Sequence, residues 1–145
     1  MYTHILVPTD GSELADKAID QGIGLAKLTG AKLTVLRVTA PPAPIVVEGV
    51  VVGYPQEEVQ AKVKERVEAH LKSLEAKAKA AGITASHMQM QGEQPWKAIV
   101  DAAKAHNVSL IVMSSHGRRG LSALVIGSET QKVLTHTDIP VLVVR

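Results

Sequence analysis

The sequence has 145 residues, a mass of 15.4 kDa and a formal net charge of +2, with 46% hydrophobic and 21% charged residues. We expect one compact domain that spans residues 1–145, because this length leaves no room for a second core. The absence of cysteine excludes disulfide frameworks, thiolate nucleophiles and cysteine zinc sites, and it favours a reducing compartment, so we expect a cytoplasmic protein.

The same composition argues against two kinds of partner. Three aromatic residues are too few for the stacking platforms of proteins that bind single-stranded nucleic acid. The sixteen basic and fourteen acidic residues are scattered, without a stripe that could follow a phosphate backbone. No apolar stretch approaches the length of a membrane span. We therefore expect neither a nucleic acid nor a membrane as partner.

The N-terminal half predicts two strands and two helices. The apolar run HILV ends in the turn PTDGS, where Ser12 can cap a helix. Small and apolar residues then recur at helical spacing until Gly30, a residue type common at helix ends. After the apolar run LTVLRV comes a proline-rich segment with two valine clusters, which indicates a long loop with room for one short element. The expected elements are strand 4–7, helix 15–30, strand 33–38, loop 39–55 and helix 59–82.

The C-terminal half continues the alternation. The run SHMQMQ is polar enough for a strand at the edge of a sheet, whereas VSLIVM is apolar throughout, as in strands buried on both faces. Pro95 suits the first turn of a helix. The expected elements are strand 83–91, helix 95–107, strand 108–113, loop 114–127, helix 128–137 and strand 139–144.

Strands that alternate with helices predict an open, doubly wound α/β fold, a five-stranded parallel sheet with helices on both faces. Such sheets bind ligands beyond the carboxyl ends of their strands, where the strand order reverses. Two segments have that position here, the turn after the first strand and the loop after the fourth. We expect the functional site between them.

The loop 114–128 carries the strongest chemical signal. Its glycines let backbone N–H groups face a ligand, and the helix that follows adds free donors and the positive end of a dipole, a combination that suits an anion. Arg118 and Arg119 can approach from the loop, and the hydroxyl of Ser128 can either cap the helix or donate to a phosphate oxygen. A plain helix start with solvated arginines is the alternative. The glycines are Gly117, Gly120 and Gly127.

Known phosphate-binding patterns of other kinds are absent. The chain has neither GxxxxGK[ST] nor a GxGxxG after its first strand, so neither a Walker-type NTPase nor a dinucleotide site is supported. Asp10 ends the first strand and can accept from ribose hydroxyls or hold a Mg²⁺ that bridges phosphates. Its alternative role is an Asx-turn that closes PTDGS onto the helix.

Over essentially its whole length the sequence resembles the universal stress protein family, through ILVPTDGS, SSHGRRGLSALVIGSETQKVL and DIPVLVV. The ATP-binding branch of that family carries G-x-x-G, nine residues, and then G-[S/T]. Gly117 matches the second glycine and Gly127-Ser128 matches the end of the pattern, whereas Ser114 stands in place of the first glycine. If position 114 needs a positive φ, a serine there costs about 1–2 kcal/mol, but in extended backbone it costs little.

The resemblance implies a Rossmann-like sheet of the adenine-nucleotide alpha hydrolase type, a homodimer and an ATP site. In that site Asp10 would hold Mg²⁺ indirectly. In that site Pro8, Thr9 and Asp10 lie beside base and ribose and Val38 lies against the adenine, with the backbone of the last helix's first turn near the phosphates. The full set of expected nucleotide-binding residues is Pro8, Thr9, Asp10, Val38, Ser114, Ser115, His116, Gly117, Arg118, Arg119, Gly120, Gly127, Ser128, Glu129 and Thr130.

Three functions remain open. The leading one is a regulatory ATP-binding module in a stress response, and we expect no catalytic residue. The second is a slow ATP hydrolase, in which Mg²⁺ on Asp10 positions the γ-phosphate and His116 assists. The third is a dimeric interaction protein that no longer binds nucleotide, an alternative that Ser114 keeps open. The histidines have no metal spacing and no GxSxG precedes a helix, which argues against other enzyme classes.

The last strand predicts a subunit contact. It is short, apolar and uncharged, and its proline suits only an edge or a strand start, so left exposed it would favour aggregation. We expect the same strand of a second subunit to cover it around a two-fold axis. The valine-rich stretch 45–52 can contribute to that contact or fold over the nucleotide. The expected interface residues are Ile139, Pro140, Val141, Leu142, Val143 and Val144.

Overall fold

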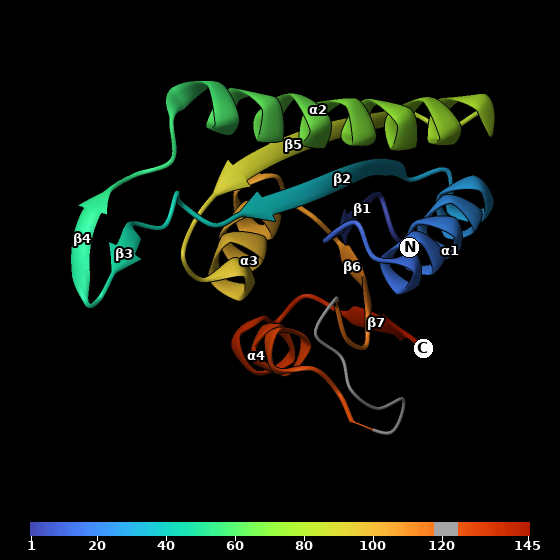
Figure 1. The fold of residues 1–145 in the computed structure, drawn as a ribbon. Coiled ribbons are helices and arrows are strands. Elements are labelled where there is room, and N and C mark those ends of the chain that lie inside the picture. The colour runs from blue at the N-terminus through green and yellow to red at the C-terminus, as the bar shows by residue number, and fades with distance from the viewer. Residues whose placement is uncertain (118–124) are drawn as a thin grey trace.

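The computed structural model describes residues 1–117 and 125–145 and shows a five-stranded sheet with helices on both faces, together with a separate two-stranded hairpin (Figure 1). The strands are β1 (His4–Pro8), β2 (Lys32–Thr39), β3 (Ile45–Val47), β4 (Val50–Gly53), β5 (Ala85–Gln91), β6 (Leu110–Ser114) and β7 (Val141–Val144). The helices are α1 (Glu13–Thr29), α2 (Glu57–Ala80), α3 (Pro95–Ala105) and α4 (Ser128–His136). In the described part of the chain, no helix is both long and apolar enough to cross a membrane.

The large sheet has the strand order β5-β2-β1-β6-β7, and all neighbouring strands are parallel. The predicted doubly wound α/β fold is therefore confirmed. The polar strand β5 lies at one edge, as its sequence predicts, and β7 lies at the other. The chain leaves β1 toward β2 on one side and later adds β6 on the other, so the strand order reverses between β1 and β6.

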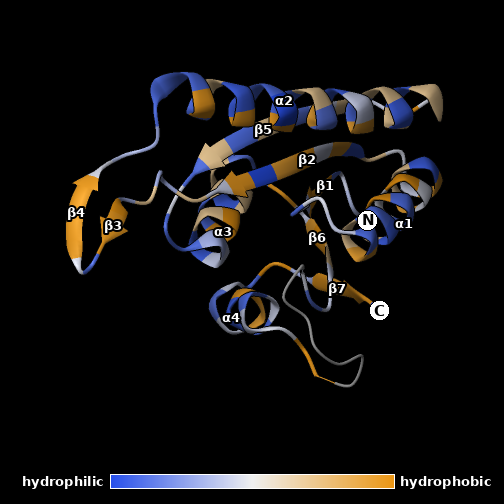
Figure 2. Cartoon of the chain, viewed as in Figure 1, coloured by the Kyte–Doolittle hydropathy of each residue, from blue (hydrophilic) through white to orange (hydrophobic). Residues whose placement is uncertain are grey.

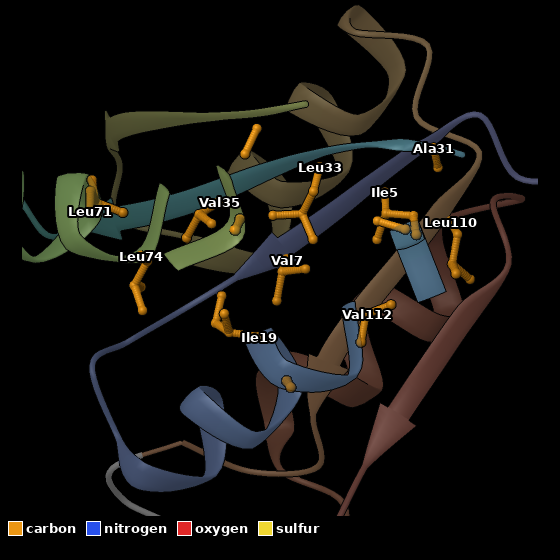
Figure 3. Packing of buried hydrophobic residues seen from close by; sticks show 14 residues of the cluster. Ile5, Val7, Ile19, Ala31, Leu33, Val35, Leu71, Leu74, Leu110 and Val112 are labelled. Carbon is orange, nitrogen blue, oxygen red and sulfur yellow. The ribbon is translucent and has the colours of Figure 1, made fainter. Parts of the chain in front are cut away.

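Two hydrophobic cores flank the sheet because alternate side chains of each buried strand point to opposite faces. Ile5 and Val7 of β1 pack with residues of α1 and α2, as Figure 3 shows for this cluster. Leu6 of β1 and Leu36 of β2 lie in the second cluster, with residues of α3 and Val133 of α4. Strands with apolar residues on both faces thus occupy the centre of the sheet, as the run VSLIVM predicts for β6.

Local signals place the ends of α1 as predicted. The side chain of Ser12 accepts a hydrogen bond from the backbone N–H of Ala15 at 3.2 Å, which makes Ser12 the N-cap. Gly30 ends the helix with a φ of 73°, in the left-handed region that glycine adopts without strain.

Two details differ from the sequence-based expectation. The segment 39–55 contains the hairpin β3–β4, whose two-residue turn places Glu48 and Gly49 at positive φ. The last strand begins at Val141; Pro140 lies just before it, where its carbonyl still accepts a hydrogen bond from the backbone N–H of Ile111 at 2.9 Å. Proline lacks the N–H that a full ladder position requires.

Candidate functional site

The two segments singled out by the sequence lie side by side at the carboxyl edge of the sheet. β1 pairs with β6 through Ile5 with Leu110 and Leu6 with Ile111. The turn after β1 and the loop after β6 therefore meet where the strand order reverses. The carboxyl end of β2 flanks them on the other side of β1, because Pro8 pairs with Leu36. This is the position at which doubly wound sheets bind their ligands.

Backbone and side-chain hydrogen bonds fix the turn after β1. The backbone N–H of Thr9, a buried residue, donates to the carbonyl of Leu36 at 2.8 Å, and the hydroxyl of Thr9 accepts from the N–H of Gly11 at 3.1 Å. The Oδ1 atom of Asp10 accepts from the N–H of Ser12 at 3.0 Å. The Asx-turn expected as the alternative role of Asp10 is thus present, and it orients the carboxylate rather than removing it from the site.

Asp10 and Gly117 are in direct contact across the crevice. A Cβ atom at position 117 would lie 2.3 Å from Oδ2 of Asp10 and 3.3 Å from its Cγ, so only a glycine fits there without a shift. One oxygen of Asp10 holds the turn, and the other faces the backbone of the loop. Side chain and loop backbone, 107 positions apart in sequence, thus meet at the carboxyl edge of the sheet.

Gly127, the last glycine of the motif, closes the loop. The N–H of Gly127 donates to the carbonyl of Ser115 at 2.6 Å, and a Cβ there would lie 3.1 Å from the Cα of His116 and 3.2 Å from the carbonyl oxygen of Ser115. The two ends of the loop therefore touch. A β-branched residue at 127 would push them apart.

Ser114 and Ser115 anchor the start of the loop. Ser114 is the last residue of β6, in strand conformation and without a positive φ, so its Cβ carries no strain of the kind that would demand glycine. Ser115 is buried; its N–H donates to the carbonyl of Val144 at 2.7 Å, and its hydroxyl shares a hydrogen bond of 3.1 Å with Nδ1 of His116.

The start of α4 differs from the expectation for Ser128. The N-cap is Gly127, with extended backbone and no side-chain cap, and Ser128 is the first helical residue, exposed to solvent. Ser128 is therefore not the cap, because its backbone has already entered the helix. A helix capped by glycine leaves its first N–H groups without a side-chain acceptor from the cap. Ser128 and these N–H groups follow directly on Gly127, whose own N–H is bonded to Ser115.

Glu129 and Thr130 have side-chain roles that sequence reasoning missed. The carboxylate of Glu129 accepts from the backbone N–H of Trp96 at 2.8 Å and so stabilises the first turn of α3. The hydroxyl of Thr130, which is buried, donates to the carbonyl of Ser114 at 2.9 Å. Nothing in the sequence around Glu129 indicates that its side chain bonds to a residue of α3.

Val38 is half-buried near the end of β2, where it pairs with Met90 of β5 and packs against the core on the α3 side. Pro8 is half-buried at the end of β1. Arg118, Arg119 and Gly120 lie outside the described residues.

Two other histidines, His4 and His87, are hydrogen-bonded to neighbouring residues of the fold. His4 is buried at the start of β1, where Nδ1 donates to the carbonyl of His106 at 3.0 Å and Nε2 lies 2.8 Å from the hydroxyl of Thr34. Burial lowers the pKa of His4. His87 of β5 bonds to Glu75 and, at 3.0 Å, to Glu68, both on α2.

The hydrogen bond to Glu75 is the main reason that the pKa of His87 is raised. Both histidines lie away from the crevice between β1 and β6. Across residues 1–117 and 125–145, no group of three or more His, Cys, Asp or Glu side chains is arranged to hold a metal ion. A cation at Asp10 would therefore need ligands from a bound molecule or water.

Comparison with known proteins finds matches within one family. The family model described as the universal stress protein family matches residues 1–145. The chain is 34% identical over 150 residues to universal stress protein YxiE of Bacillus subtilis, and all of both chains is covered.

Solved structures of similar proteins share the fold. Universal stress protein UspA from Lactobacillus plantarum has a TM-score of 0.81 at 24% identity, with 99% of this chain and 98% of the other covered. A universal stress protein in complex with cAMP has a TM-score of 0.72 at 24% identity, with coverage of 99% and 97%. A universal stress protein from Archaeoglobus fulgidus in complex with dAMP has a TM-score of 0.68 at 21% identity, with coverage of 99% and 98%.

Proposed function

The chain belongs to the universal stress protein family, and from that premise we propose that it is a regulatory module that binds an adenine nucleotide, ATP with Mg²⁺, in the crevice between β1 and β6. The observation that carries the proposal is the contact between Asp10 and Gly117. It brings a carboxylate and a glycine backbone together at the point of strand-order reversal, where nucleotides bind in this type of sheet.

The residues fit a nucleotide from base to phosphate. Val38 offers an apolar surface at the end of β2 for the adenine, and Asp10 can accept from ribose hydroxyls. The hydroxyl of Ser128 and the first N–H groups of α4 suit phosphate oxygens. Because the carboxylate of Glu129 is bonded to Trp96, it does not place a negative charge toward those phosphates.

The carboxylate of Asp10 also fits Mg²⁺. A carboxylate beside a phosphate tail would repel it unless a cation lay between them. Mg²⁺ typically binds one or two protein carboxylates and takes its other ligands from phosphates and water. Asp10 supplies one such carboxylate, and no further acidic cluster is required.

We infer that occupancy changes the surface of the protein rather than driving turnover. A ligand shifts a conformational equilibrium by its difference in affinity for the two states. Nδ1 of His116 is bonded to the hydroxyl of the buried Ser115, so a role as general base on a γ-phosphate would fall to its Nε2. The cysteine-free sequence supports a reducing compartment such as the cytoplasm.

The direct test is to denature freshly purified protein, identify released small molecules by mass spectrometry, and then titrate ATP, ADP, AMP and cAMP by calorimetry with and without Mg²⁺. We expect ATP to bind, more tightly with Mg²⁺. Gly127→Val should abolish binding in a folded protein, because its side chain would force His116 and Ser115 out of place.

Gly24→Ala is the matched control, since a Cβ at position 24 would meet no atom within 4 Å. Unchanged affinity in Gly127→Val would contradict the site. Sustained phosphate release that Asp10→Asn abolishes would instead establish an ATP hydrolase, and failure of all four nucleotides to bind would refute the proposal.

We also propose a homodimer formed through β7. This edge strand is uncharged and only partly covered, and its Leu142 is 39% exposed. An unpaired apolar edge is a site for strand addition, and a two-fold axis lets two copies cover each other. Light scattering at micromolar concentration should show a species larger than the monomer, and Leu142→Lys should weaken the contact. A wild-type monomer would contradict this proposal.

A further inference from the structure

The hairpin β3–β4 projects from the body of the protein as an apolar arm, orange along both strands in Figure 2. Its six valine and isoleucine side chains are between 47% and 63% exposed. Alternate residues of a strand face opposite ways, so this uniform exposure means that neither face of the hairpin is covered. Within the described chain, each hairpin strand packs extensively only on the other.

Such an arm is unstable as a free element in water. A two-stranded hairpin alone is marginally stable, and this one offers two open edges and no charged residue within its strands. Together with Tyr54, Val59 and Val63, which are 51% to 63% exposed, it presents nine large apolar side chains to solvent, and large exposed apolar patches mark interaction sites. The arm therefore calls for a covering surface.

A groove of matching character lies at the base of the arm. Its cavity, of about 500 Å³, opens between the first turns of α2 and the carboxyl ends of β2 and β5. The lining is largely apolar and includes Pro42, Pro55, Val59, Val63 and Met90. Val59 and Val63 are 51% and 53% exposed although they lie one helical turn apart on the side of α2 that faces the groove.

The charges of arm and groove are complementary. Glu48, in the turn of the hairpin, is the only charged residue between Ile45 and Gly53, and among the described residues that line the groove Lys64 is the charged one. The cavity has room for a few valine-sized side chains. One chain thus carries both a projecting apolar element with an acidic tip and an apolar recess with a basic group.

We propose that the hairpin of one copy of this chain docks in the groove of a second copy, and that the second copy returns the same contact, with Glu48 near the partner's Lys64. Because one chain carries both the hairpin and the groove, two copies related by a two-fold axis can make the same contact twice. The contact lies on the β5 side of the sheet, whereas β7 is at the opposite edge. The two interfaces can therefore coexist, and together they would give a dimer of dimers.

The first test is the mass of the protein in solution. Light scattering at micromolar concentration should show that Val51→Lys and Val63→Lys each form an oligomer of half the wild-type mass. The change should be from tetramer to dimer, or from dimer to monomer if β7 does not associate. Leu28→Lys is the control, because Leu28 is 85% exposed on α1, remote from arm and groove, and should keep the wild-type mass. Wild-type mass in both hairpin and groove variants would overturn the proposal.

The second test uses the absence of cysteine from the chain. A Glu48→Cys protein is mixed with a tagged Lys64→Cys protein under mild oxidation, and a non-reducing gel should show a mixed disulfide of intermediate size. Tagged Lys27→Cys, exposed on the last turn of α1, should give little of it. Equal cross-linking in both mixtures would overturn the docking. The docking would also be overturned if Val51→Lys and Val63→Lys kept the wild-type mass but bound ATP more weakly, since the arm would then be covering the nucleotide.

Discussion

Replacing Gly117 by alanine tests whether the loop after β6 rests on Asp10. The new methyl group would lie 2.3 Å from Oδ2 of Asp10, closer than the 3.0 Å below which real Cβ atoms essentially never approach another atom. Gly117 has no positive φ, so alanine carries no backbone strain of its own at this position. Any loss of stability must therefore come from the contact with the carboxylate.

The structure sets the size of the effect. The simplest relief is a rotation of Asp10, which breaks the hydrogen bond from the N–H of Ser12 to Oδ1. A hydrogen bond to a charged group is worth about 1.5–3 kcal/mol, and water replaces part of it at a half-buried site, so we expect a loss of about 1–2 kcal/mol. For a chain of this length that corresponds to a fall in Tm of roughly 2–8 °C.

Thermal and urea unfolding of Gly117→Ala, Asp10→Ala and the double variant measure the coupling between the two sites. The loss caused by Gly117→Ala should disappear in the Asp10→Ala background, because the atom that it meets is gone. Gly24→Ala should instead raise stability by up to about 1 kcal/mol, since it adds helix propensity without a contact. An undiminished loss in the Asp10→Ala background would refute the assigned contact.

Three further predictions concern stability, each measured by urea unfolding. The pKa of His87 is raised chiefly by its hydrogen bond to Glu75, so His87 should stabilise the protein relative to His87→Gln below about pH 6.5. This extra stability should be lost as the pH rises through the raised pKa, and a difference in unfolding free energy that does not change with pH would contradict the prediction. The pKa of His4 is lowered by burial, so wild type should lose stability relative to His4→Gln as pH falls below about 6.5. Thr130→Val removes the buried hydroxyl that donates to the carbonyl of Ser114 and should cost about 1–3 kcal/mol, whereas Thr135→Val on the exposed face of α4 should cost little.

Most of the fold can be predicted from the sequence because its signals are local. The apolar runs predict the strands, Ser12 and Gly30 mark the ends of α1, and the alternation of elements predicts a parallel sheet. The hairpin is missed as a definite element because proline-rich flanks predict a loop more strongly than the pair Glu48-Gly49 predicts a tight turn.

The candidate site is only partly predictable for a different reason. The motif identifies Asp10, Gly117 and Gly127, but the reasons for glycine at 117 and 127 are close approaches between distant segments. The side chain of Glu129 bonds to α3 and that of Thr130 bonds to β6. Partners of this kind follow from packing, which no spacing rule in a single sequence encodes.

The carbonyl of Val144, the last residue of β7, accepts the N–H of Ser115, whose own carbonyl receives the N–H of Gly127. One residue, Ser115, thus joins the two ends of the loop after β6 to the strand at the sheet's edge. On the proposed function, a ligand that draws the loop inward would pull on that strand, and a second subunit that holds the strand would steady the loop. Filling the crevice and pairing the edges should therefore strengthen each other by the same factor, whichever event comes first.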